Sequence, residues 1–250
     1  MKKVLNPKYG GSNFHGMRWA YYKGVFVEDF ERKIKLTKKR LVNKVVLDVG
    51  CNDGKNVFRF SSIVKEIYGI EVMEECVNLA IKNNDKNNVF FKKGDAEKIP
   101  FSDNKFDVVY SLWVLEHLRN PAKFFEEVFR VLKPGGILIL WAPSVLNPTG
   151  FLIKLVSNNY KTKFLSILSK KPVEEVSDME CFYRANYVRA IDKLTNENLV
   201  RIFLERYDNP AYFSKSRFLT YLWYLRYRLT NNRFLDFIKP SFYVEYKKLK

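Results

Sequence analysis

The sequence predicts an α/β fold in which a doubly wound, mostly parallel sheet carries helices on both faces. Short apolar runs rich in β-branched residues alternate with segments of helical periodicity between residues 44 and 143. The first run ends at Asp48-Val49 and passes directly into a turn that contains Gly50 and Gly54. Open α/β sheets bind nucleotide-like ligands at such a turn, although an ordinary strand-to-helix connection can carry the same glycines.

The remaining elements follow from the same two periodicities. We expect strands over residues 44–49, 63–70, 89–93, 106–111 and 137–142, and a short closing strand over 241–247. Helices are expected over 25–42, 55–61, 74–83, 121–132, 151–169 and 196–207. Pro121 suits the first turn of its helix, Pro134-Gly135-Gly136 follows the end of that helix, and Thr195 suits the N-cap of the last one.

A chain of 250 residues can bury one sizeable core, so we expect one domain with additions at both ends. Residues 1–43 are predicted as an N-terminal cap segment, 44–143 as the ligand-binding core, and 144–250 as helical cap insertions with the closing strands. Three cysteines and two histidines suggest neither a disulfide framework nor a metal site. Without a signal peptide or a run of about 18 apolar residues, we expect a cytoplasmic protein.

The net charge of +17 comes entirely from the flanks of the core. Residues 1–43 carry 11 Lys and Arg against 3 Asp and Glu, and residues 151–250 carry 19 against 10. Residues 44–150 carry 14 of each sign and are neutral. Basic flanks favour an anionic partner, either a phosphorylated substrate, a membrane surface or nucleic acid. A solvated basic surface that keeps the protein soluble is the alternative.

Acidic residues recur where three of the predicted strands end. Asp48 closes the first strand, Glu71 follows the second and Asp95 follows the third. The carboxyl ends of parallel strands lie along one rim of a sheet, so these carboxylates are expected near one another. A carboxylate after the second strand can accept both hydroxyl protons of a ribose. Each residue alone is more simply a helix cap or a loop carboxylate, but the three together favour a nucleoside site.

The motifs over residues 40–143 resemble those of class I S-adenosylmethionine-dependent methyltransferases, in the broad group that includes small-molecule and lipid-quinone enzymes. The matching segments are V-L-D-V-G-C-N-D-G, then G-I-E, then G-D-A-E-K-I-P-F-S-D-N-K-F-D-V-V-Y-S, then V-L-K-P-G-G. The resemblance implies a Rossmann-like sheet of seven strands whose last strand, here residues 241–247, is antiparallel. It also implies S-adenosyl-L-methionine as the cofactor.

By this resemblance, the turn from Gly50 to Gly54 approaches the methionine part of the cofactor, and Asp48 orients its amino group. Ser111, at the end of the fourth strand, lies where the backbone of the family touches the methionine. Asn52 stands where glycine is usual. Asparagine tolerates left-handed backbone best among the non-glycine residues, so we expect the turn to keep its shape.

The nucleoside part of the cofactor is assigned by the same resemblance to the second and third strands. Glu71 would hold the ribose hydroxyls, and Val72 would lie against the adenine. Asp95 would contact the adenine amine, while the backbone of Ala96 would contact the ring.

Methyl transfer from a sulfonium is an in-line displacement, so aligning donor and acceptor can supply much of the rate. A general base matters only when the acceptor must lose a proton. His117, in L-E-H-L after the fourth strand, is the candidate base, and a structural role is its alternative. His15 and Tyr21 are candidates for a lid, with surface packing as their alternative. Cys51 is interpreted as a small packing residue.

Residues 217–238 suggest what the acceptor is. Their apolar positions form one helical stripe, edged by arginines and by Trp and Tyr side chains. Such an amphipathic helix can lie in a membrane interface, which would make the protein peripheral at a membrane. It can equally be a lid helix or a dimer contact. With residues 151–169 it is predicted to roof the site of a small-molecule acceptor that is hydrophobic or lipid-linked.

Two other functional classes fit parts of the sequence. An RNA methyltransferase could use the basic flanks to follow phosphates, but no RNA-binding module is recognised and Asn147-Pro148-Thr149 does not match the motif of amino-group methylation. A non-catalytic protein that binds S-adenosylmethionine is the third class.

Overall fold

The computed structural model describes residues 25–147, 180–195, 197–207 and 234–250, with isolated positions between them, and side chains from residue 31 onward. The chain divides into two compact units. The larger unit comprises Lys33–Pro143, Phe182–Glu205 and Phe242–Lys250, and the smaller one comprises Met1–Arg32, Ser144–Cys181 and Arg206–Ser241. The predicted division at residues 43 and 143 stays a prediction.

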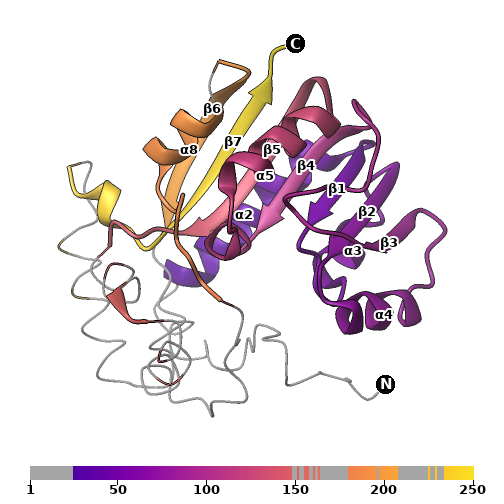
Figure 1. Ribbon diagram of the computed structural model, residues 1–250, viewed down its shortest axis with the longest axis horizontal. Helices are drawn as coiled ribbons and strands as arrows, with labels where there is room; N and C mark the ends of the chain where they lie inside the picture. Colours follow the sequence, from indigo (N-terminus) through magenta and orange to yellow (C-terminus); the bar gives the residue numbers. More distant parts are fainter. Residues whose placement is uncertain are drawn as a thin grey trace. The chain divides into compact units, whose positions relative to one another are not determined.

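Seven strands form one sheet in the order β3-β2-β1-β4-β5-β7-β6 (Figure 1). Their bounds are β1 Val45–Val49, β2 Glu66–Glu71, β3 Val89–Lys93, β4 Phe106–Leu112, β5 Leu132–Pro143, β6 Leu199–Tyr207 and β7 Ser241–Lys248. Strands β3, β2, β1, β4 and β5 pair in parallel, each with its neighbour. Figure 1 shows β7 running against β4. The doubly wound, mostly parallel sheet of the prediction is therefore confirmed, and β1 lies beside β4 where the strand order reverses.

The described helices are α2 Val25–Leu41, α3 Lys55–Phe60, α4 Glu74–Lys82, α5 Pro121–Val131 and α8 Val188–Thr195, with short 3-10 helices η2 Leu115–His117 and η5 Asp236–Ile238. Four of them match the helices predicted over 25–42, 55–61, 74–83 and 121–132. Helix α5 begins as its sequence indicates, because Pro121 occupies the first turn and the Asn120 side chain accepts a hydrogen bond from Lys123 N.

The helices cover the sheet from both sides. The main core cluster joins α5 and α8 to alternate residues of β5, Leu138, Leu140 and Ala142. The residues between them face the other way, and Trp141 among them meets α2. There, Lys33 Nζ of α2 lies 4.1 Å from the Trp141 ring centroid. Figure 1 shows α5 and α8 in front of the sheet and α2 behind it.

The helix predicted over residues 196–207 is wrong. This segment is strand β6, Leu199–Tyr207, and Thr195 ends α8 instead of capping a new helix. Apolar residues at 199, 202 and 203 fit a helical stripe as well as a strand, so their spacing could not decide between the two. The β-branched and aromatic content of the segment and an edge place beside β7 favour the strand.

Two strand boundaries also differ from the prediction. Strand β2 begins at Glu66, because residues 61–65 form the turn that leads into it. Strand β5 begins at Leu132, directly after α5, and includes Pro134-Gly135-Gly136. The pairing with β4 shifts register there, since Phe106 pairs with Leu132 while Val108 pairs with Ile137. Gly135 has a φ of 76°, as the irregular start of this strand requires.

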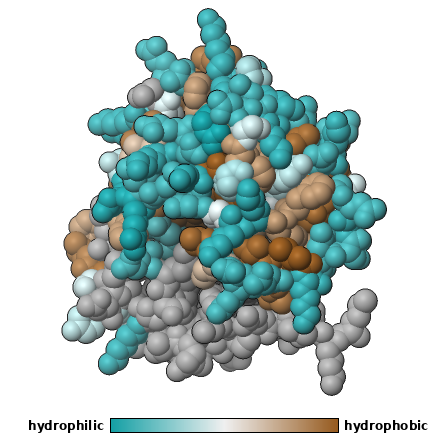
Figure 2. Space-filling model, turned by 45° about the vertical axis from the view of Figure 1, so that its right-hand side comes forward, coloured by the Kyte–Doolittle hydropathy of each residue, from teal (hydrophilic) through white to brown (hydrophobic). Residues whose placement is uncertain are grey.

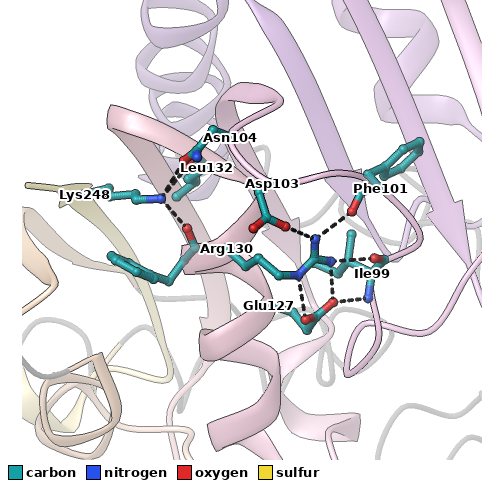
Figure 3. Close-up of polar contacts among 9 residues, drawn as sticks. Ile99, Phe101, Asp103, Asn104, Glu127, Arg130, Leu132 and Lys248 are labelled. Carbon is teal, nitrogen blue, oxygen red and sulfur yellow. Dashed lines mark hydrogen bonds and ion pairs between the residues drawn. The ribbon is translucent and has the colours of Figure 1, made fainter. Parts of the chain in front are cut away.

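A polar cluster ties the loop after β3 to α5 and to β7 (Figure 3). Arg130 of α5 donates to the carbonyls of Ile99 and Phe101 at 2.8 and 2.7 Å, and pairs with Glu127 and Asp103. Lys248 Nζ donates to Asn104 Oδ1 and to the carbonyls of Phe129 and Leu132. These two cations thus fix the loop that follows Asp95 and the last strand of the sheet.

Three predictions fall on parts of the chain outside the described residues. They concern the N-terminal segment with His15 and Tyr21, the helix over residues 151–169, and the aromatic and basic segment over 217–238 apart from a few positions. In the part of the chain that the structure describes, no helix is long and apolar enough to cross a membrane.

Candidate functional site

The turn after β1 has the backbone that its glycines predict. Gly50 and Gly54 both have a φ of 80°, and Asn52 between them has a φ of 49°. The expectation that Asn52 adopts left-handed backbone is confirmed. A Cβ at Gly50 would collide with the Val114 side chain, and one at Gly54 would lie 2.7 Å from the Phe91 ring. Both glycines are therefore required by conformation and by space.

Strand β2 holds this turn in place. Gly50 N and Cys51 N donate to the carbonyl of Ile70 at 2.9 and 3.0 Å. The Glu71 carboxylate accepts from Asn52 N at 3.0 Å through Oε2, and from Val72 N at 2.9 Å through Oε1. The side chain of Glu71 is therefore fixed by backbone donors from two loops. A carboxylate has about four lone-pair sites, so this one keeps acceptor capacity for a ligand.

Asp48 lies beneath the turn and is only 2% exposed. Burial raises the pKa of its carboxyl group to about 8, and the nearby Glu71 carboxylate raises this pKa further. The partner opposite Asp48 in the sheet is Tyr110 of β4. An acid with this pKa holds its proton near neutral pH and loses it readily when a cation approaches.

Ser111 follows Tyr110 and closes the site from the side of β4. Its hydroxyl donates to the carbonyl of Val49 at 3.1 Å, across the pair that these two residues form between β4 and β1. Ser111 as a whole is buried, and this hydrogen bond occupies its hydroxyl proton.

Asp95, Ala96 and Val72 lie at the more open part of the rim. Gly94 N donates to the carbonyl of Glu71 at 3.0 Å, which places the loop after β3 beside the end of β2. Asp95 is exposed, and its Oδ1 accepts from Glu97 N at 2.8 Å. Val72 is also exposed. Figure 2 shows one face of the molecule, on which hydrophilic side chains prevail and several hydrophobic areas lie between them.

A cavity of about 440 Å³ lies between the same loop and α5. Its walls are Asp95, Glu97, Lys98, Lys123, Glu126 and Glu127. Asp95 is the one predicted site residue in this lining, so the cavity lies apart from the buried carboxylates of β1 and β2.

His117 ends the short helix η2 that follows β4, and its side chain is half-buried. Val114, just before η2, packs its side chain against Gly50, so this segment adjoins the turn after β1. His117 N donates to the carbonyl of Val114 at 2.8 Å. The structure thus places His117 three residues from a contact with the predicted cofactor turn, and its role as a base stays a prediction.

Sequence reasoning missed two neighbours of His117. Glu116 is buried, and burial raises the pKa of its carboxyl group. Its carbonyl accepts from Phe182 N and Tyr183 N at 2.7 and 3.2 Å, which fastens η2 to the segment before α8. Trp113 has a φ of 61°, a conformation that is rare for an aromatic residue. The Glu-His dipeptide was visible in the sequence, but nothing in it indicated which of the two side chains is buried.

Cys51 is buried, as expected of a packing residue, and burial raises the pKa of its thiol. Among the residues that the structure describes, no group of three or more His, Cys, Asp or Glu side chains could hold a metal ion.

Comparison with known proteins agrees with this geometry. Residues 47–140 match the family described as "Methyltransferase domain". The chain is 34% identical over 116 residues to an uncharacterized methyltransferase, YcgJ, of Bacillus subtilis, covering 45% of this chain and 46% of that protein. The solved structure of YcgJ superposes with a TM-score of 0.57 at 18% identity, over 88% of this chain and 99% of that one.

Two relatives have named reactions. The sterol 24-C-methyltransferase of Schizosaccharomyces pombe is 36% identical over 143 residues, covering 52% of this chain and 36% of that protein. The ubiquinone biosynthesis O-methyltransferase of Pelagibacter ubique is 26% identical over 194 residues, covering 76% and 75%. The chain spans less than half the length of the relatives in B. subtilis and S. pombe. Residues 47–140 thus form a methyltransferase domain, and the strand order and the turn after β1 agree with the class I, S-adenosylmethionine-dependent fold.

Proposed function

We propose that this protein transfers the methyl group of S-adenosyl-L-methionine to a small, hydrophobic or lipid-linked acceptor. One observation supports the cofactor above all others. The buried acids Asp48 and Glu71 flank a left-handed turn, Gly50–Gly54, at the point where the strand order reverses. Burying two carboxylates without a cation is unfavourable, so their place at a ligand rim points to binding and not to stability.

The residues present fit this cofactor at each end. Asp48 would take the ammonium group of the methionine part, with the backbone of Gly50, Asn52, Gly54 and Ser111 around it. Glu71 would accept the ribose hydroxyls through the lone pairs that its three backbone donors leave free. Val72 and Ala96 would lie against the adenine, and Asp95 would accept from its amine.

The bound cofactor supplies a methyl group on a positively charged sulfur. The chain contributes position, because the fixed turn and the fixed Glu71 carboxylate hold the donor while the acceptor approaches in line. His117 would remove a proton from an oxygen or nitrogen acceptor. A carbon acceptor that loses no proton before transfer would leave His117 with a structural role.

The nature of the acceptor is inferred from the relatives and from the flanks. A sterol and a quinone pathway appear in the names of two relatives, and both indicate apolar acceptors. The excess of basic charge lies outside residues 44–150, which suits a phosphorylated or membrane-associated acceptor. RNA is the alternative that the same charge allows.

Calorimetry with S-adenosylmethionine tests the cofactor, and labelling tests the acceptor. Asp48→Ala and Glu71→Ala should each weaken binding severalfold or more, whereas Asp85→Ala, an exposed acid in another loop, should not. Unchanged affinity in both site variants would contradict the assigned pocket. A cell extract incubated with methyl-labelled cofactor is then separated into lipid, RNA, protein and small molecules. Label in the lipid or small-molecule fraction supports the proposal, and label in RNA overturns the choice of acceptor.

A further inference from the structure

Tyr110 is a buried tyrosine placed directly against the acid beneath the cofactor turn. Asp48 of β1 and Tyr110 of β4 are partners in the parallel register. Tyr110 is 0% exposed, and the Phe60 ring of α3 meets it edge-on at 5.8 Å between centroids. The ring of Tyr110 is therefore held by packing, and its hydroxyl stays within the same dry region as the Asp48 carboxylate.

No hydrogen bond of good geometry joins the Tyr110 hydroxyl to the described residues, although Asp48 lies near enough for a hydrogen bond between the two side chains to affect the pKa of both. Buried polar groups in folded proteins nearly always have one, and an unpaired donor costs free energy. The hydroxyl and the Asp48 carboxyl group lie close enough for each to raise or lower the pKa of the other. When Asp48 loses its proton, a small movement of the two side chains would therefore let the Tyr110 hydroxyl donate a hydrogen bond to the carboxylate.

The charges around Asp48 explain why it holds a proton before the cofactor binds. Glu71 of β2 approaches it with a like charge, and Cys51 of the turn is buried beside it. The cation Arg59 of α3 acts on Tyr110, whose pKa it lowers. Burial dominates these contributions and raises the pKa of Asp48 to about 8.

We propose that cofactor binding displaces one proton from Asp48 to solvent, and that Tyr110 is the positioning residue that hydrogen-bonds the resulting carboxylate. This inference rests on the proposed function. The balance is simple: the neutral acid and the ammonium group become an ion pair, and one proton leaves. An ammonium cation in this dry site stabilises the Asp48 carboxylate. The Tyr110 hydroxyl orients that carboxylate by donating a hydrogen bond to it.

The test is calorimetry of S-adenosylmethionine binding between pH 6 and 7.5, in phosphate and in Bis-Tris. The two buffers differ in ionisation enthalpy, so the difference in heat counts the protons released. The wild type should release close to one proton at pH 6, and its affinity should rise about tenfold per pH unit. Above pH 7.7–8.0 an α-amino group loses its own proton, so the rise ends there.

Two variants separate positioning from structure. Asp48→Asn should release no proton and bind with little pH dependence. Tyr110→Phe should bind more weakly throughout this pH range, since the ionised carboxylate loses its donor. In the Asp48→Asn background, where no carboxylate forms, the same substitution should have little effect. Tyr246→Phe is the matched control, because the hydroxyl of this β7 residue donates to Asp192 of α8 and not to a residue of the cofactor turn. It should keep the profile of the wild type.

Three results would overturn the inference. The first is a wild-type affinity that does not depend on pH, and the second is proton release that persists in Asp48→Asn. The third is a Tyr110→Phe substitution that weakens binding as much in the Asp48→Asn background as in the wild type, which would mark Tyr110 as structural only. Failure of the folded wild type to bind the cofactor at any pH is distinct from these, because it overturns the proposed function as well.

Discussion

The carboxylate of Glu71 accepts a hydrogen bond from the backbone N–H of Asn52, so the acid that ends β2 holds the turn that follows β1. The same carboxylate accepts from Val72 N and Met73 N. Two adjacent strand ends are thereby locked together through one side chain.

Glu71→Ala should therefore affect both binding and local order. Hydrogen bonds to charged groups contribute about 1.5–3 kcal/mol each, and part of that is recovered by water at this rim. We expect a loss in S-adenosylmethionine affinity of at least tenfold, and faster amide exchange at Asn52 and Val72. Glu74→Ala is the control, since that exposed acid pairs with Lys93 at 2.7 Å and not with the turn after β1. Unchanged exchange at Asn52 would show that Glu71 does not order the turn.

Gly50→Ala tests the contact between the turn and the segment after β4. The new methyl group would collide with Val114, and a φ of 80° disfavours any residue with a Cβ by about 1–2 kcal/mol. We expect a lower free energy of unfolding in urea and weaker cofactor binding. The double variant Gly50→Ala with Val114→Ala should recover stability in part, because it relieves the collision and leaves the backbone strain. A double variant no more stable than the single one would count against this contact.

Arg130→Lys tests the polar cluster of Figure 3. A lysine keeps the charge but cannot reach two carbonyls and two carboxylates at once, as the guanidinium does. We expect the free energy of unfolding to fall by about 1–3 kcal/mol. The exposed Lys123→Ala in the same helix should change it by less than about 0.5 kcal/mol. Equal effects of the two substitutions would show that the cluster is not what holds the loop.

The pH dependence of stability should carry the signature of Asp48. Its pKa of about 8 in the folded protein lies above the ordinary value of 3.8, so between these values the folded state binds a proton that the unfolded state has released. Raising the pH through this window therefore destabilises the wild type through this group. Asp48→Asn removes that contribution, so its stability relative to the wild type should increase from pH 5 to pH 8. Urea unfolding at pH 5, 6.5 and 8 measures the free energy of unfolding of both proteins. A difference between them that does not change with pH would contradict the prediction.

Sequence reasoning reached the sheet and the cofactor turn because their signals are local. Buried parallel strands are continuous apolar runs, and the left-handed turn requires residues such as Gly50 and Asn52, so both can be read without tertiary information. Strand β6 was mistaken for a helix because its apolar residues fit either period, and pairing with β7 decides the matter. Glu116 and Tyr110 could not be assigned from the sequence, since the burial of a side chain depends on which residues the fold packs around it.

Strand β7 lies between β5 and β6 although it is the last of the three in the chain. During synthesis, β6 leaves the ribosome before the strand that must separate it from β5. Until Ser241–Lys248 has emerged, the edges of both β5 and β6 are open to wrong pairing with each other or with a neighbouring chain. Strands β5, β7 and β6 can therefore pair correctly only after β7 has been translated. Strands β1 to β4 can assemble before that.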